Sequence, residues 1–138
     1  MKLILESLGY NFDDEYQIWI RSDYKGISYN DGDEVENRIF EILKNVDDLS
    51  VLSDELRPHC NDWPSLYHLS SSRANILRPF ESHLGSDVLE IGAGCGAITR
   101  YLGECGGNVL ALEGTPRRAA ITRARTRGLD NVTVLSEK

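Results

Sequence analysis

The sequence predicts an α/β fold with a parallel sheet, and three observations in its second half support this. Short apolar runs typical of strands occur at 87–91, 108–114 and 131–135. Segments with helical features, 97–105 and 116–127, lie between these runs. The connections between them are short. Alternation of strands and helices with short loops implies right-handed crossovers and strands that run parallel.

The first of these strands ends in a glycine-rich turn, around which the rest of the chain is organised. The strand 87–91 is apolar enough to be covered on both faces, as central parallel strands are. Three glycines follow within five residues: Gly92, Gly94 and Gly96. Without a Cβ atom they let the chain turn sharply and let a ligand approach the backbone. A helix that begins near Ala97 directs its free N–H groups and positive dipole end to the same place, which suits an anionic or strongly polar group.

Two kinds of ligand fit this turn. In the frame Gly92-x-Gly94-x-x-Ala97, the turn matches a dinucleotide-binding fingerprint, with Glu113 about 20 residues on as the acid that binds the ribose. In the other frame an acid, Glu90, stands two residues before the first glycine.

The second frame, Glu90-x-Gly92-x-Gly94-x-Gly96, resembles the first motif of class I S-adenosylmethionine-dependent methyltransferases. Two features favour it. An ionisable Glu90 at a strand end needs a polar partner, which the ammonium of an amino-acid cofactor supplies. The pyrophosphate of a dinucleotide repels a carboxylate, so an apolar residue is more usual there.

The resemblance covers residues 87–135 and implies that S-adenosyl-L-methionine is the cofactor. Glu90 would orient the turn and the methionine ammonium, and Glu113, at the end of the second strand, would hold the ribose hydroxyls. Backbone of the turn would lie against the cofactor. The expected cofactor-binding residues are Glu90, Gly92, Ala93, Gly94, Cys95, Gly96, Glu113 and Gly114.

With the stretch from Trp63 to Phe80, the chain also looks like methyltransferase modules of bacterial polysaccharide-assembly proteins, some fused to glycosyltransferases. This narrower resemblance implies a small-molecule or saccharide acceptor. A helix before the first strand often lies across the cofactor pocket in this class, so Tyr67, His68 and Arg73 are candidate contacts to cofactor or acceptor. Each also has an ordinary explanation, since a lone histidine is often structural and Arg73 can pair with an acid.

The resemblance is to the first half of the family's domain. The chain supplies three strands of a Rossmann-like parallel sheet, whereas the family has seven, and the fourth usually carries acceptor and catalytic residues. We therefore expect an N-terminal part of a longer protein, inactive alone, with no catalytic residue to name. Residues 1–64 are expected to form a small α+β region, and residues 65–138 the first half of the cofactor-binding domain. The first strand would keep an open edge, so we expect the fragment to form a homodimer or to cover that edge with its N-terminal hairpin.

Elements of the N-terminal half are predicted from local signals. Residues 16–21 and 27–29 are expected to form a hairpin around a turn at 25–26. A helix is expected from Asp33, capped together with Glu36. A second helix is expected over 49–56, followed by a loop over 59–64. A serine-capped helix is expected within 65–84, with Pro79 kinking or restarting it and Gly85 ending it.

Charge and composition exclude several classes. Residues 1–86 carry 16 acids and 8 bases, and residues 87–138 carry 6 acids and 7 bases, for a net charge of −7. Such a chain is a poor candidate for binding nucleic acid or an anionic membrane. The sequence has no run long enough for a signal peptide or a membrane span, which favours a cytoplasmic protein.

Its three cysteines are odd in number and lack metal-ligand spacing, so free thiols in a reducing compartment are expected. Cys95 lies in the glycine turn, where a helix N-terminus can lower a thiol pKa, or where it is merely a small side chain in a tight loop. The acids of the first 36 residues fit no EF-hand loop, and no metal site is expected. The five arginines between 117 and 127 are expected to be solvated. Two rival functions stay open: an NAD(P)-binding oxidoreductase fragment and a non-catalytic Rossmann-like interaction module.

Overall fold

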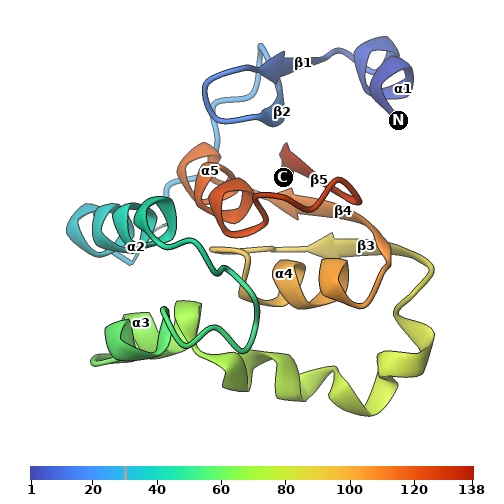
Figure 1. Ribbon diagram of the computed structural model, residues 1–138. Helices are drawn as coiled ribbons and strands as arrows, with labels where there is room; N and C mark the ends of the chain where they lie inside the picture. Colours follow the sequence, from blue (N-terminus) through green and yellow to red (C-terminus); the bar gives the residue numbers. More distant parts are fainter. Residues whose placement is uncertain (30) are drawn as a thin grey trace.

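A computed structural model describes residues 1–29 and 31–138, and its centre is one five-stranded sheet (Figure 1). The strand order is β1-β2-β5-β4-β3, and β1 is antiparallel to β2 while the other neighbours are parallel. The prediction of an α/β fold with a mainly parallel sheet is confirmed. The strands are β1 Tyr10–Asp13, β2 Ile18–Arg21, β3 Asp87–Ile91, β4 Asn108–Glu113 and β5 Val132–Ser136.

Helices connect the parallel strands and cover the sheet unequally. In Figure 1, α4 and α5 follow β3 and β4, as the sequence predicts, whereas α1 lies beside the β1–β2 hairpin. The α-helices are α1 Lys2–Ser7, α2 Asp33–Asn45, α3 Trp63–Leu69, α4 Ala97–Glu104 and α5 Pro116–Arg125. Three 3₁₀ helices complete the chain: η1 Arg57–His59, η2 Ser71–Ile76 and η3 Arg78–His83.

The two faces of the sheet pack differently because alternate residues of a strand point to opposite sides. Val109, Ala111 and Val134 are buried in a core shared with Leu102 of α4 and Ala119 of α5. On the other face, the buried residues Trp19 and Leu135 pack against Leu5 of α1. Leu89 and Ile91 of β3 do not belong to this cluster and are 58% and 78% exposed.

The hairpin differs from the predicted one. Its strands are β1 and β2, and residues 27–29 form no strand. The turn is set by Asp13, whose carboxylate accepts hydrogen bonds from the amides of Glu15 and Tyr16, both at 2.9 Å. An Asx turn of this kind fixes the register before the glycine at 26 is reached. The prediction missed it because Lys25-Gly26 looked like the stronger turn signal.

The position of the hairpin is also a correction. The hairpin was expected as one of two ways to cover the open edge of the first predicted strand, which is β3. Instead β2 pairs with β5, through Trp19 opposite Leu135, at the other side of the sheet. Among the described residues, β3 has β4 as its one paired neighbour.

The predicted helix over 49–56 is replaced by turns. The hydroxyl of Ser53 donates to the Asp48 carbonyl oxygen at 2.6 Å and accepts from the Leu56 amide at 3.2 Å. Ser50 N–H donates to the Asp48 carboxylate at 2.8 Å. These side chains form hydrogen bonds with backbone groups, and such bonds compete with the backbone hydrogen bonds of a helix.

The single helix predicted over 65–84 is three short ones. The first, α3, begins at Trp63 because Asp62 caps it, accepting from Ser65 N–H at 2.9 Å. Ser70 then caps η2, and Pro79 lies in the first turn of η3. Pro64 occupies the first turn of α3, so part of the predicted loop is helical.

No helix in the described part of the chain is both long enough and apolar enough to cross a membrane.

Candidate functional site

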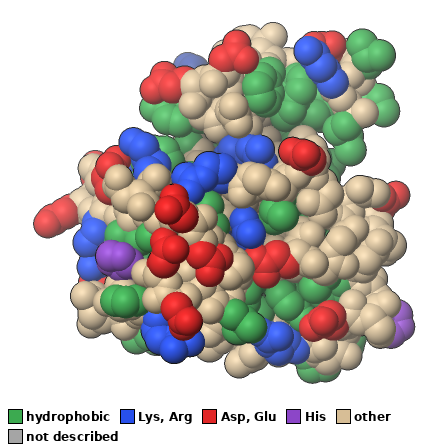
Figure 2. All heavy atoms as spheres, in the orientation of Figure 1, with side chains coloured by type: hydrophobic (Ala, Val, Ile, Leu, Met, Phe, Trp, Pro, Cys, Tyr) green, Lys and Arg blue, Asp and Glu red, His purple; other side chains and the backbone are tan. Residues whose placement is uncertain are grey.

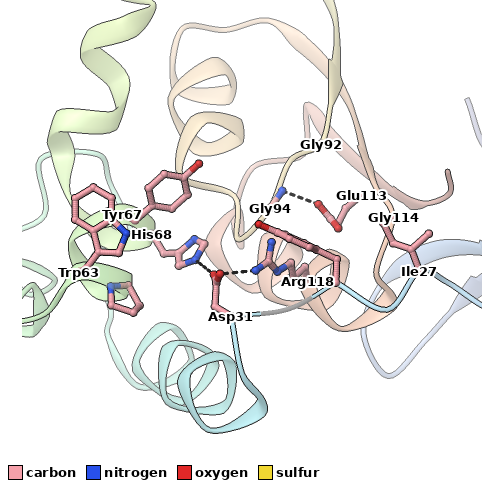
Figure 3. A pocket seen from close by; sticks show the side chains of 12 residues that line it. Ile27, Asp31, Trp63, Tyr67, His68, Gly92, Gly94, Glu113, Gly114 and Arg118 are labelled. Carbon is pink, nitrogen blue, oxygen red and sulfur yellow. Dashed lines mark hydrogen bonds and ion pairs between the residues drawn. The ribbon is translucent and has the colours of Figure 1, made fainter.

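A cavity of about 640 Å³ opens at the carboxyl ends of β3 and β4, where the glycine turn lies (Figure 3). Carboxyl ends of parallel strands are the usual place for ligands in open α/β sheets. The walls come from the glycine turn, the end of β4, the segment before α2, and helices α3 and α5. The lining residues are Ile27, Tyr29, Asp31, Trp63, Pro64, Tyr67, His68, Gly92, Gly94, Glu113, Gly114 and Arg118.

Two glycines of the turn leave open space beside the backbone. Gly92 and Gly94 have φ values of +80° and +61°, which L side chains rarely adopt. A Cβ atom added at either would meet no other heavy atom within 4 Å. The two glycines therefore bend the chain and let a ligand reach the backbone, as the sequence predicts.

The backbone amides of the turn were expected to be available to a ligand, but several of them form hydrogen bonds within the protein. The N–H groups of Gly92 and Ala93 both donate to the Leu112 carbonyl oxygen, at 2.9 and 3.0 Å. Gly94 N–H donates to the Glu113 carboxylate at 2.8 Å. The turn is thereby fastened to β4, and these three donors are engaged without a ligand.

Glu113 is 6% exposed and lies in the cavity wall, at the end of β4. Its Oε2 accepts from Gly94 N–H, and its Oε1 accepts from the amide of Thr115 at 2.9 Å and its hydroxyl at 3.3 Å. A carboxylate offers about four acceptor positions, two on each oxygen. The position left over is on Oε2, where one ligand hydroxyl can donate. The expected hold on both ribose hydroxyls is thus reduced to one acceptor position.

Glu90 stands two residues before the turn, is half-buried and is not among the residues that line the cavity. Burial raises the pKa of this carboxyl to about 6. The nearby Thr99 hydroxyl opposes the shift, and the negative charge of Glu113 adds to it. Among the described residues, neither Glu90 Oε2 nor Thr99 Oγ1 has a well-formed hydrogen bond, although both atoms are buried. This acid, with one oxygen lacking such a bond, is the clearest sign that the turn is built for a polar partner.

Three other predicted turn residues pack within the protein. Ala93 and Cys95 are buried in separate core clusters. A Cβ atom at Gly96 would lie 2.9 Å from Thr122 Cα, so this glycine lets α5 approach the start of α4. Burial raises the pKa of the Cys95 thiol to about 12, which rules out the activated thiol and leaves the small packed side chain. Gly114 lines the cavity, and the Ile27 side chain packs against it.

The three candidate contacts before β3 separate into two groups. Tyr67 and His68 of α3 line the cavity, with their rings 5.0 Å apart and edge to face. Arg73 is not among the lining residues. Its guanidinium lies over the Tyr67 ring, 4.1 Å from the ring centre, so it contacts the wall of the cavity through Tyr67.

An ion-pair network that the sequence analysis missed completes the wall. Arg118 is buried and its NH2 group lies 2.8 Å from the Asp31 carboxylate, while its Nε donates to Glu36 at 2.7 Å. The same Asp31 oxygen lies 2.7 Å from His68 Nε2 (Figure 3). The prediction of solvated arginines is wrong for Arg118 and also for Arg125, which is 1% exposed. Glu36, which is 2% exposed, pairs across the fold with Arg118, and its Oε1 also accepts from the Asp31 amide just before α2 at 3.3 Å.

Charges around the cavity are mainly negative. Asp31 and Glu113 line it and Glu36 lies behind Arg118, which is the single lysine or arginine among the lining residues. Over the face shown in Figure 2, acidic and basic side chains are intermixed, with acids gathered towards the middle. In the described part of the chain, no three His, Cys, Asp or Glu side chains are grouped to hold a metal ion.

Comparisons with protein families, with curated proteins and with solved structures found no match for this chain.

Proposed function

We propose that this chain is the cofactor-binding part of an S-adenosylmethionine-dependent methyltransferase. The observation that carries the proposal is the arrangement of acids around an open glycine turn. Glu113 lines the cavity, and the half-buried Glu90, two residues before the turn, has a buried oxygen that lacks a well-formed hydrogen bond. A cationic amino-acid nucleoside suits such a site, and a pyrophosphate does not.

Each residue has a task that its geometry allows. Glu113 Oε2 accepts a hydrogen bond from one ribose hydroxyl, while its other bonds keep the carboxylate fixed. The backbone at Gly92 and Gly94 lets the cofactor lie against the turn, because no side chain fills that space. Glu90 acts as the balancing charge for the cofactor's amino-acid end.

When bound, S-adenosylmethionine supplies a methyl group on a sulfonium and leaves as a neutral thioether. The protein therefore needs to do little more than hold the acceptor in line with that methyl group and keep water away. The aromatic wall of Trp63 and Tyr67 opposite Glu113 is suited to enclosing an acceptor.

The test is calorimetric titration of the protein with S-adenosylmethionine, S-adenosylhomocysteine and NAD. We expect the first two to bind and NAD not to bind. Glu113→Gln should weaken binding about 10- to 100-fold, the loss expected for a charged hydrogen bond. Glu34→Gln, which removes an exposed acid on α2, is the matched control and should bind as the native protein does.

Other results would contradict the proposal. Binding of NAD alone would favour a dinucleotide-dependent oxidoreductase. Binding of none of the three compounds would favour a non-catalytic interaction module. Circular dichroism of Glu113→Gln must show a folded protein, since this carboxylate also holds the turn to β4.

A further inference from the structure

His68 is held in the cavity wall by an acid from a distant part of the chain. Its side chain is 4% exposed, and its Nε2 lies 2.7 Å from Asp31 Oδ2. Figure 3 shows the imidazole directed at Asp31, beside Tyr67 and Trp63 on the wall opposite Glu113. The pair is thus on the far side of the cavity from the proposed ribose site.

Asp31 is fixed from two further directions. The Arg118 NH2 group lies 2.8 Å from the same carboxylate oxygen, and the Asp31 amide donates to Glu36 Oε1 at 3.3 Å. Arg118 is itself held by Glu36 and lies over the Tyr29 ring, 4.8 Å from its centre. Asp31 is therefore held by residues of three helices, α2, α3 and α5.

This geometry sets the state of the imidazole. An ionised carboxylate accepts hydrogen bonds and donates none, so the ring nitrogen facing Asp31 must carry the proton. In the neutral ring, the other nitrogen, Nδ1, then holds a lone pair. His68 lines the cavity, and its Nε2 is the ring nitrogen that faces Asp31.

We propose that His68 is the general base for methyl transfer to a hydroxyl group, with Asp31 as its positioning residue. This inference rests on the proposed function. In the step, the acceptor oxygen forms a bond to the methyl carbon as the bond from carbon to sulfur breaks. The electron pair of that bond stays on sulfur, which becomes a neutral thioether, and the hydroxyl proton passes to Nδ1 of His68.

The substrate class follows from the chemistry of the wall. A hydroxyl group must lose its proton as it is alkylated, which is the task of a neutral imidazole at hydrogen-bond distance. Trp63 and Tyr67 are 76% and 43% exposed and their ring centres lie 6.3 Å apart, offering an apolar surface beside that base. The acceptor is therefore a small hydroxyl compound with an apolar face.

Imidazole nitrogen NMR of the ¹⁵N-labelled protein, at mildly alkaline pH, tests the proposed state. His68→Gln assigns the signal, since His59 and His83 are the other two histidines. We expect Nε2 of His68 to carry the proton shared with Asp31, and Nδ1 to resonate at the strongly deshielded position of an unprotonated nitrogen. Asp31→Asn should shift this pattern towards a mixture of tautomers. An imidazolium, or a ring protonated at Nδ1, would overturn the proposal.

Access to the lone pair is tested with diethyl pyrocarbonate, which acylates unprotonated imidazole nitrogens. Peptide mass spectrometry should find His68 modified in the folded protein together with the more exposed His59 and His83. A structural histidine enclosed by protein would react only after unfolding, and that result would overturn the proposal.

Calorimetry separates this inference from the proposed function. His68→Gln should bind S-adenosylhomocysteine within about twofold of the native protein, because the histidine faces the acceptor. Loss of that binding in His68→Gln would overturn the assignment of His68 to the acceptor side. Failure of the native protein to bind the cofactor would overturn the proposed function instead.

Discussion

The Glu113 carboxylate accepts bonds from Gly94 N–H and from Thr115, so it joins the glycine turn to β4 even without a ligand. In Glu113→Gln, the side-chain NH₂ must face one of these backbone N–H groups in either orientation. We expect the free energy of unfolding to fall by about 1–3 kcal/mol, the cost of a buried donor without an acceptor.

Urea denaturation measures this change, with Glu34→Gln as the control that removes an exposed acid and leaves stability unchanged. Equal stability of Glu113→Gln and the native protein would show that the two backbone contacts contribute nothing.

Glu90 gives a pH-dependent prediction. Its pKa rises from the usual 4.5 to about 6 in the folded protein, so the folded state binds this proton more tightly than the unfolded chain. The stabilisation is complete below pH 4.5 and is lost as the pH rises through about 6. Relative to Glu90→Gln, which does not titrate, the native protein should lose about 2 kcal/mol over this range.

Chemical unfolding of both proteins across this pH range checks the prediction. A stability difference that does not change with pH would contradict the raised pKa of Glu90. Glu34→Gln serves again as the exposed comparison and should track the native protein.

Residue roles were predictable where they depended on local sequence. The strain at Gly92 and Gly94 and the place of Glu113 at the end of a strand follow from spacing along the chain. Asp31 and Arg118 were missed because their roles arise from contacts between distant segments. Arg118, for example, pairs with Glu36, 82 positions earlier, and no periodicity or motif marks that pair.

At the scale of elements, Gly96 tests how α4 and α5 meet. Gly96 and Gly128 have the same φ of +82°, but a Cβ atom at Gly96 would lie 2.9 Å from Thr122 Cα, whereas one at Gly128 would meet nothing within 4 Å. Gly128→Ala should cost about 1–2 kcal/mol of unfolding free energy from backbone strain alone. Gly96→Ala should cost about 1–3 kcal/mol more, because α5 must move.

Thermal and urea unfolding of the two variants give the difference directly. Equal destabilisation of Gly96→Ala and Gly128→Ala would mean that α5 can move away from Gly96 at Thr122 with no loss of stability.

Element prediction succeeded where hydrophobic periodicity dominates. The run from β3 to β5 alternates apolar strands with helices through short loops, and each was expected within a few residues of its observed bounds. The expectation that β3 is covered on both faces is wrong, because Leu89 and Ile91 are exposed. Element prediction failed over 49–56 and in the hairpin, where Asp48, Ser53 and Asp13 bind backbone groups and set the chain path. From sequence alone, an Asp or Ser that caps a helix cannot be distinguished from one that stabilises a turn.

At the scale of the whole molecule, the order of the strands in the sheet could not be predicted from the sequence. Nothing in the local pattern of 18–21 distinguishes pairing with β5 from pairing with β3. The choice is made by packing, since Trp19 is buried with Leu135 and with Leu5 of α1. Its consequence is that β3 remains at an edge, with Leu89 and Ile91 exposed on one face.

An unpaired edge strand with exposed apolar side chains is a template for pairing with another chain. We expect the protein to associate as its concentration rises, through β3, and Ile91→Lys to prevent this because a charged edge resists pairing. Sedimentation velocity over a range of concentrations measures the mass. Leu3→Lys, which changes an 81% exposed leucine on α1, is the matched control and should associate as the native protein does. A native protein that stays monomeric at every concentration, or a Leu3→Lys variant that alone becomes monomeric, would show that the edge of β3 is not the surface of contact.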